Sequence, residues 1–125
     1  MNWTLTQVAL GGATGSTLRY LTNVSVMRLI GPGFPWGTVI VNIVGSFAMG
    51  ALVVLLAHKG GMRFAPLLLT GVLGGFTTFS AFSLDTFTIY ERGQPGVAVA
   101  YILGSVSLSL LALLAGVLLT RGAFA

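Results

Sequence analysis

Residues 71–82 read Gly71-Val-Leu-Gly-Gly-Phe-Thr-Thr-Phe-Ser-Ala-Phe82, in the middle of a long apolar segment. A membrane-spanning helix would place aliphatic side chains at this depth, but this stretch has three glycines, two threonines and a serine. Adjacent Gly74 and Gly75 weaken a helix through backbone entropy, and the β-branched Thr77 and Thr78 weaken it further. Broken helices at membrane depth are tolerated where they are buried in protein or line a watery cavity. The stretch therefore predicts a membrane transport protein with its site at a broken helix.

The composition indicates an integral membrane protein. The chain of 125 residues is 55% hydrophobic and 6% charged, with a mean hydropathy of +0.98, whereas a soluble domain carries about 25% charged residues. The six basic residues are scattered singly, so no basic patch for nucleic acid is expected, and the predicted surroundings are the lipid bilayer. Two carboxylates, one histidine and no cysteine cannot assemble a catalytic set or a metal-ligand cluster, so we expect no enzymatic activity.

The apolar segments predict an all-α membrane domain with four transmembrane helices. The predicted spans cover about residues 3–21, 36–57, 64–90 and 97–120, with a connector at residues 23–35. The third span is too long for one straight helix across about 30 Å of hydrocarbon. A break near Gly74–Thr78 resolves the excess by dividing this span into two half-helices.

The charges at the span ends give no preferred orientation. Three basic residues fall on each side of the membrane: Lys59, Arg63 and Arg121 on one, and Arg19, Arg28 and Arg92 on the other. The positive-inside rule therefore decides nothing. A chain without orientation bias can insert both ways, and two opposed copies can pair about a two-fold axis in the membrane plane. We expect a dual-topology antiparallel homodimer.

Two predicted helices carry polar stripes at helical spacing. The stripe residues are Thr38, Asn42 and Ser46 in the second span and Tyr101, Ser105 and Ser109 in the fourth. An unpaired amide in hydrocarbon costs several kcal/mol, so Asn42 must face a partner helix or water. Bonding between helices and donation to a transported group are both open for Asn42. The serine hydroxyls can equally bond back to their own helix.

The remaining polar features suit a small anion. Phe79 and Phe82 lie three residues apart on one face, and aromatic rings are positive at their rims, although core packing is their more common role. Arg19, at the end of the first span, either snorkels to the interface or draws anions to a vestibule. Asp85 is expected at the far membrane interface. A cation path would instead show acceptors or a ring of carboxylates.

The run Gly74-Gly-Phe-Thr-Thr-Phe-Ser-Ala-Phe82, with the upstream run Trp36-Gly-Thr-Val-Ile-Val-Asn-Ile-Val-Gly45, resembles the Fluc (CrcB) family of bacterial fluoride channels. The resemblance extends over the whole chain, including its length, the Gly-Pro-rich first connector and the turn at residues 91–93. It implies an antiparallel homodimer in the bacterial plasma (inner) membrane, whose two narrow pores passively export fluoride. It also implies a central structural Na⁺ that is held by backbone carbonyls of Gly74 and Thr77 from both subunits.

The same resemblance implies roles for the polar and aromatic residues. Phe79 and Phe82 would present ring edges to fluoride, Asn42 would donate to it, and Arg19 would stand at the vestibule. The other implied pore residues are Ser80 near the break, Thr38, and the fourth-helix track of Tyr101, Ser105 and Ser109. Two positions depart from the family pattern, because Ala81 stands where Thr is usual and Asp85 where Glu is common.

Two other classes compete with a fluoride channel. A small dual-topology multidrug exporter would need a membrane-embedded glutamate in the first span, and this span has none. A non-transporting structural subunit would leave unexplained why a helix break and polar stripes occur together.

Overall fold

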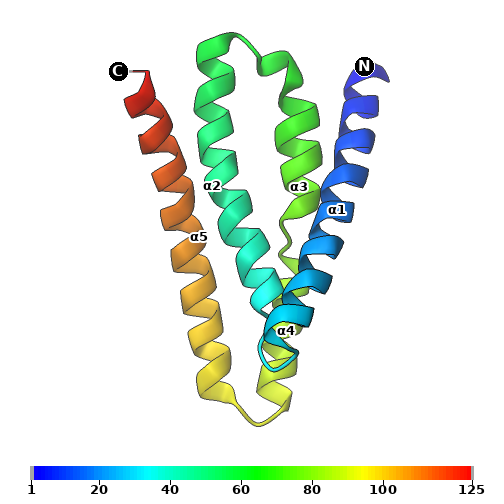
Figure 1. The fold of residues 1–125 in the computed structure, drawn as a ribbon, viewed down its shortest axis with the longest axis vertical. Coiled ribbons are helices and arrows are strands. Elements are labelled where there is room, and N and C mark those ends of the chain that lie inside the picture. Colours follow the sequence, from blue (N-terminus) through cyan, green and yellow to red (C-terminus); the bar gives the residue numbers. More distant parts are fainter. Residues whose placement is uncertain (1, 125) are drawn as a thin grey trace.

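The computed structural model describes residues 2–124, which form helices and turns and include no strand. The long helices are α1 (Asn2–Ile30), α2 (Trp36–Lys59) and α5 (Pro95–Ala123). Between α2 and α5 lie the short 3₁₀-helix η1 (Met62–Phe64), the π-helix η2 (Pro66–Leu73), α3 (Gly74–Phe76) and α4 (Ser80–Glu91). The chain runs up and down along one axis, and both termini lie at the same end (Figure 1).

Three helical segments of the described chain are long and apolar enough to cross a membrane: Trp36–Lys59, Met62–Glu91 and Pro95–Ala123. Helix α1 has 29 residues, so it is long enough, but it is less apolar and is not among the three. The structure thus shows an all-helical protein with at least these membrane-competent segments. A fourth span depends on α1, whose packing is described below.

Helix α1 is longer than predicted. The predicted span ended at Leu21, with a connector over residues 23–35, but the helix continues to Ile30 and the connector shortens to residues 31–35. No glycine or proline interrupts residues 21–30. Gly31 then adopts φ +97°, and its N–H donates to the Met27 carbonyl at 2.9 Å, which ends the helix in the manner of a glycine cap.

The predicted break in the third span is confirmed, but it lies further along the chain than expected. Gly74 and Gly75 are helical, and the helix ends at Phe76. Thr77 is extended, with φ −85° and ψ 162°, and α4 begins at Ser80. The break therefore occupies residues 77–79, which overlap the C-terminal part of the predicted range Gly74–Thr78, while Gly74 and Gly75 themselves are helical.

Gly75 instead allows close packing between α1 and the broken helix, together with Gly71, Gly11 and Gly15. A Cβ added at Gly75 would lie 2.8 Å from the Gly12 carbonyl oxygen, and one at Gly15 would overlap the Val72 carbonyl oxygen. A Cβ at Gly71 would lie 2.8 Å from the Cα of Gly11. Small residues that let two backbones touch are a common packing device between membrane helices. Backbone contact along this seam places α1 directly against η2 and α3.

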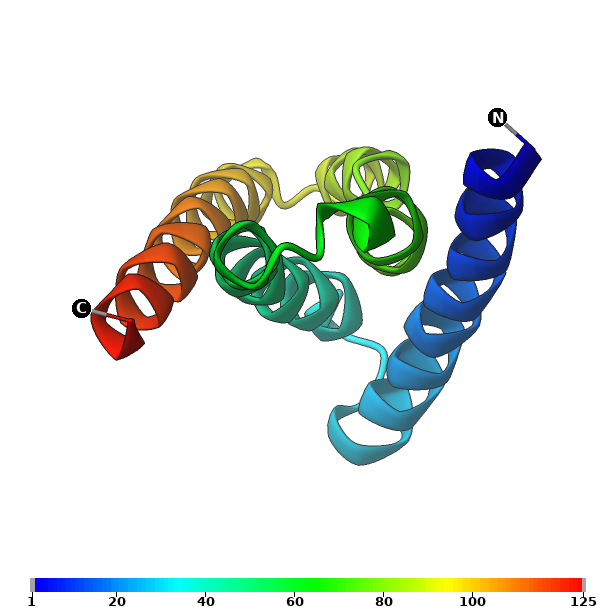
Figure 2. The ribbon, with the colours of Figure 1, turned by 90° about the horizontal axis from the view of Figure 1, so that it is seen from above.

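Helices α2 and α5 pack by the same device. A Cβ at Gly50 would overlap the Leu113 carbonyl oxygen, and one at Gly116 would overlap the Phe47 carbonyl oxygen. In the view along the bundle, α2 and the broken helix lie between α1 on one side and α5 on the other (Figure 2). The break is therefore held in the interior of the arrangement, with α2 on one side of it and α1 on another.

Candidate functional site

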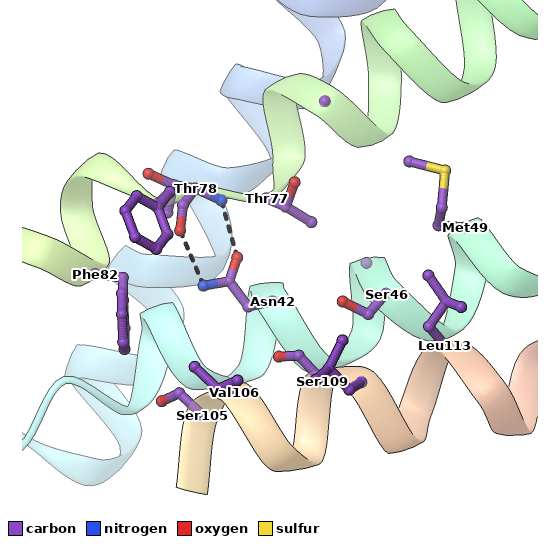
Figure 3. Close-up of a pocket in the computed structure, with 14 residues that line it drawn as sticks. Asn42, Ser46, Met49, Thr77, Thr78, Phe82, Ser105, Val106, Ser109 and Leu113 are labelled. Carbon is purple, nitrogen blue, oxygen red and sulfur yellow. Dashed lines mark hydrogen bonds between the residues drawn. The ribbon is translucent and has the colours of Figure 1, made fainter. Parts of the chain in front are cut away.

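An open cavity of about 490 Å³ lies beside the break (Figure 3). Its walls come from α2, from the end of α3 with the break, and from α4 and α5. The lining residues are Asn42, Gly45, Ser46, Met49, Gly74, Thr77, Thr78, Phe79, Phe82, Ser105, Val106, Ser109, Leu110 and Leu113. These side chains include serine and threonine hydroxyls, one amide and two phenylalanine rings, and none of them is charged.

Asn42 holds the broken backbone in place. Its Oδ1 accepts from the Thr78 N–H at 2.8 Å, and its Nδ2 donates to the Thr78 carbonyl at 3.0 Å (Figure 3). In an uninterrupted helix, these two backbone groups would bond to Gly74 and Phe82. The amide therefore replaces the hydrogen bonds that the break removes. Of the two roles left open by the sequence, bonding between helices is made, while donation to an ion stays a prediction for the second Nδ2–H.

The break leaves carbonyl oxygens with different partners. The Gly75 oxygen accepts from Arg19 Nε at 3.0 Å, and the Thr78 oxygen accepts from Asn42. The oxygens of Gly74, Phe76 and Thr77 accept no hydrogen bond from residues 2–124. Two of these three residues, Gly74 and Thr77, line the cavity. Unwound carbonyls and carbonyls at the C-terminal ends of half-helices are the ligands with which broken helices hold Na⁺ in membrane proteins, so the predicted pair fits that ion.

The two phenylalanines predicted to face an ion lie together. Their ring centroids are 5.6 Å apart and the rings are inclined by 44°. The Phe82 side chain is 8% exposed, whereas that of Phe79 is 76% exposed. Phe82 in turn contacts the Tyr101 ring at 5.1 Å. One ring thus belongs to the interior and the other stands at the open side of the cavity.

The serines of α5 also reach the cavity, and one of them lacks a partner. Ser105 and Ser109 both line the cavity wall (Figure 3). The Ser105 Oγ is buried and makes no hydrogen bond within the described chain. The bond back to its own helix, which the sequence left open, is therefore not made by this residue. A buried hydroxyl without a partner is costly and calls for a ligand or a water.

Thr38 and Tyr101 are placed differently from the prediction, because neither lines the cavity. Both donate to the same atom, Asp85 Oδ2, at 2.7 Å from Thr38 Oγ1 and 3.0 Å from the Tyr101 hydroxyl. Asp85 is half-buried and its carboxylate is hydrogen-bonded, while its expected position at the membrane interface stays a prediction. The signal that would have found this cluster is the cost of a carboxylate in an apolar span, which requires hydrogen-bond donors nearby.

Ser80 and Arg19 also lie outside the cavity lining. Ser80 Oγ is 3.4 Å from Thr78 Oγ1, which itself accepts from the Ala81 N–H at 3.1 Å. This last bond satisfies one of the free donors in the first turn of α4. At position 81 the backbone N–H makes the contact, so the alanine leaves this bond intact.

Comparison with known proteins places the chain in a family. The model of the CrcB family, described as "CrcB-like protein, Camphor Resistance (CrcB)", matches residues 6–117. A protein of Cereibacter sphaeroides is 68% identical over 118 residues, with 94% of each chain covered. A protein of Paracoccus denitrificans is 60% identical over 125 residues and is covered completely, as is this chain. A protein of Agrobacterium fabrum is 54% identical over 119 residues, which are 94% of this chain and 95% of its own.

All three relatives are named "Fluoride-specific ion channel FluC". The names describe ion channels and not enzymes, in agreement with the absence of a catalytic set in the sequence. The resemblance that was carried by residues 36–45 and 74–82 is confirmed by these matches over nearly the whole length. The chain belongs to the CrcB family.

Proposed function

We propose that this chain forms a fluoride channel, which lets fluoride leave the bacterial cytoplasm passively across the plasma membrane and thereby relieves its toxicity. The observation that carries the proposal is the buried, unpaired Ser105 hydroxyl in the wall of an uncharged cavity. The names of the curated relatives support the same ion.

The cavity has the chemistry to replace the water around a small anion. Ser105 and Ser109 offer hydroxyl donors, Asn42 has a second Nδ2–H, and Phe79 and Phe82 offer the positive rims of their rings. Among the described residues no carboxylate side chain lines the cavity, so its wall carries no negative charge to repel an anion. Each donor is held on a helix or by the clamp at Thr78, so little reorganisation is required when the ion enters.

The open side of the cavity supports an antiparallel homodimer. Phe79 is 76% exposed, and Leu110, which lines the same cavity, is 65% exposed. An opposed second copy would cover these groups and close each cavity into one of two pores. Arg19 lies at the level of the break and does not count toward either end of the bundle. The count of basic residues at the two ends is then three against two, with Arg28 and Arg92 at the second end. This difference gives only a weak preference for one orientation in the membrane.

In this assembly α1 would be a fourth membrane span, because α1 packs backbone to backbone along η2 and α3. Tags on the termini should then be found on both sides of the membrane in cells. A single orientation would contradict the antiparallel dimer without affecting the choice of ion.

At the centre of the dimer, the Gly74 and Thr77 carbonyls of both copies would hold Na⁺. When bound, this ion would supply a fixed positive charge and link the two broken helices. The support lies in the donor-free carbonyls beside the cavity and in the Thr77 N–H and Oγ1, which both bond to the Leu73 carbonyl at 3.0 and 2.9 Å. These two bonds fix the residue at which the helix ends.

The proposed activity is tested by ion efflux from liposomes that contain the purified protein. We expect rapid fluoride efflux, followed with a fluoride electrode, and no chloride efflux above that of empty liposomes. Equal movement of both ions would contradict selectivity for fluoride. Movement of neither ion would favour a non-transporting subunit and would overturn the proposal.

Ser105→Ala tests whether the Ser105 hydroxyl donates a hydrogen bond to fluoride. Because the Oγ has no hydrogen-bond partner in the part of the chain that the structure describes, its loss should leave thermal stability unchanged or slightly raised. Fluoride efflux should nevertheless fall by about tenfold, the size of one lost hydrogen bond to a charged group. Ser83→Ala is the matched control, because that hydroxyl bonds the Phe79 carbonyl at 2.9 Å and lies outside the cavity lining. Wild-type efflux from Ser105→Ala would contradict the role assigned to this hydroxyl.

A further inference from the structure

Arg19 makes a contact that a vestibule charge does not require. Its Nε–H donates to the Gly75 carbonyl at 3.0 Å, although the two residues are 56 positions apart. In an uninterrupted helix this carbonyl would accept from the Phe79 N–H, which the break removes. A guanidinium at the C-terminal end of a helix is favoured by the helix dipole, and a charged donor makes a stronger bond than a neutral one. Arg19 therefore caps α3.

The seam between the helices brings Arg19 to this position. Gly11, Gly15 and Arg19 are spaced four residues apart, so they lie on one face of α1. The two glycines let this face touch the backbone of η2 and α3, since a Cβ at either position would overlap it. The next residue on the same face is then aligned with the end of α3. The side chain is half-buried there, unlike that of Arg28, which is exposed on the same helix.

A second clamp acts three residues further along. Asn42 of α2 holds both backbone groups of Thr78, while Arg19 of α1 holds the carbonyl of Gly75. The peptide groups between these two points include Thr77, and Gly74 directly precedes them. Of the two carbonyls that fit a cation, that of Thr77 lies between the two clamps and that of Gly74 directly precedes the first clamp, and neither side chain bonds to either of them.

We propose that Arg19 is a positioning residue for the Gly74 and Thr77 carbonyls. By fixing the Gly75 carbonyl toward α1, Arg19 sets the orientation of the neighbouring peptide groups. This inference rests on the proposed sodium site. It assigns the effect to the donor at Nε and not to the positive charge.

Three substitutions separate the donor from the charge. In Arg19→Gln, the Nε2 donor stands the same number of bonds from Cα as the arginine Nε, but the charge is lost. Arg19→Met keeps a chain of similar length and has neither donor nor charge. Arg19→Lys keeps the charge and moves the donor one bond further out. Arg28→Met is the matched control, because it removes an exposed arginine from α1.

The first measurement is the Na⁺ concentration that gives half of the maximal thermal stabilisation of the purified protein. We expect Arg19→Met to raise this concentration by about tenfold, as for the loss of one charge-assisted hydrogen bond. Arg19→Gln should stay within about threefold of wild type, and Arg28→Met should match wild type. If Arg19→Gln behaves like Arg19→Met while Arg19→Lys behaves like wild type, charge alone acts and the proposal is overturned.

The second measurement is hydrogen exchange of the amides of residues 77–79, made without Na⁺ or fluoride. Arg19→Met should speed exchange in this segment by about tenfold relative to Arg19→Gln and Arg28→Met. Unchanged exchange in Arg19→Met would overturn the proposal. If wild type shows no stabilisation by Na⁺, the proposed sodium site fails on its own, and the exchange comparison still decides whether Arg19 fixes the break.

Discussion

Fluoride efflux is expected to fall by about 100-fold or more when Asn42 is replaced by leucine, a loss of about 2.7 kcal/mol or more. The substitution removes both hydrogen bonds to Thr78 and leaves its N–H and carbonyl unpaired. Each unpaired buried group costs about 1–3 kcal/mol, so the break is expected to rearrange. The rearrangement would move Phe79, whose ring stands at the open side of the cavity. Efflux from liposomes with equal amounts of protein measures the effect.

A control for the Asn42 experiment comes from the same wall of the cavity. Met49 also lies on α2 and lines the cavity, but its thioether makes no hydrogen bond among residues 2–124. Met49→Leu keeps the volume nearly constant and should retain most of the efflux. Both variants should elute from a sizing column like wild type. If Asn42→Leu folds and passes fluoride at more than a tenth of the wild-type rate, the clamp at Thr78 is not required for the pore.

Gly15→Ala should be strongly destabilising, by about 3 kcal/mol or more, although it adds a single methyl group. The new Cβ would overlap the Val72 carbonyl oxygen, and a backbone atom cannot move aside as a side chain can. Helix α1 would have to separate from η2 and α3, which would also lengthen the bond between Arg19 and Gly75. Thermal unfolding in detergent measures the loss.

Gly12→Ala provides the comparison for Gly15→Ala on the same helix. A Cβ at Gly12 meets nothing within 4 Å, so the substitution should be neutral or stabilising by up to about 1 kcal/mol, the gain in helix propensity. The two variants share that gain and differ in the contact alone. Equal unfolding temperatures for both would show that α1 does not pack on the broken helix as described.

The broken helix shows how far reasoning from one segment reaches. An apolar run too long for the membrane, with glycines and threonines at its centre, predicts an interruption, and residues 77–79 are indeed not helical. Gly75 nevertheless lies in the helix, where it permits close packing against α1. A glycine weakens a helix and also permits close packing, and the sequence of one segment does not distinguish these effects. Gly12 and Ser16 of α1, which touch the position of the Gly75 Cβ, decide between them.

The polar stripes also show which features the sequence predicts and which depend on packing. Helical spacing placed Asn42 on a polar face of one helix and Ser105 and Ser109 on a polar face of another, and all three line the cavity. It also grouped Thr38 and Tyr101 with them, because all five are polar and regularly spaced. Thr38 and Tyr101 instead donate to Asp85 of α4, which belongs to neither stripe. Their hydroxyls therefore bond away from the cavity.

Composition and spacing were sufficient for the membrane class, the interrupted helix and the polar faces, and the family followed from the resemblance carried by residues 36–45 and 74–82. The packing of the helices determined the hydrogen-bond partners. Arg19 bonds to Gly75, Asn42 to Thr78 and Thr38 to Asp85, across 56, 36 and 47 residues. Periodicity reports which side of an element a residue occupies, and it carries no information on what faces that side. A side-chain hydrogen bond across such separations forms when two helices pack side by side, and a glycine seam sets that packing for α1 against the broken helix. The same docking left the Ser105 hydroxyl in the cavity wall without a hydrogen-bond partner among residues 2–124.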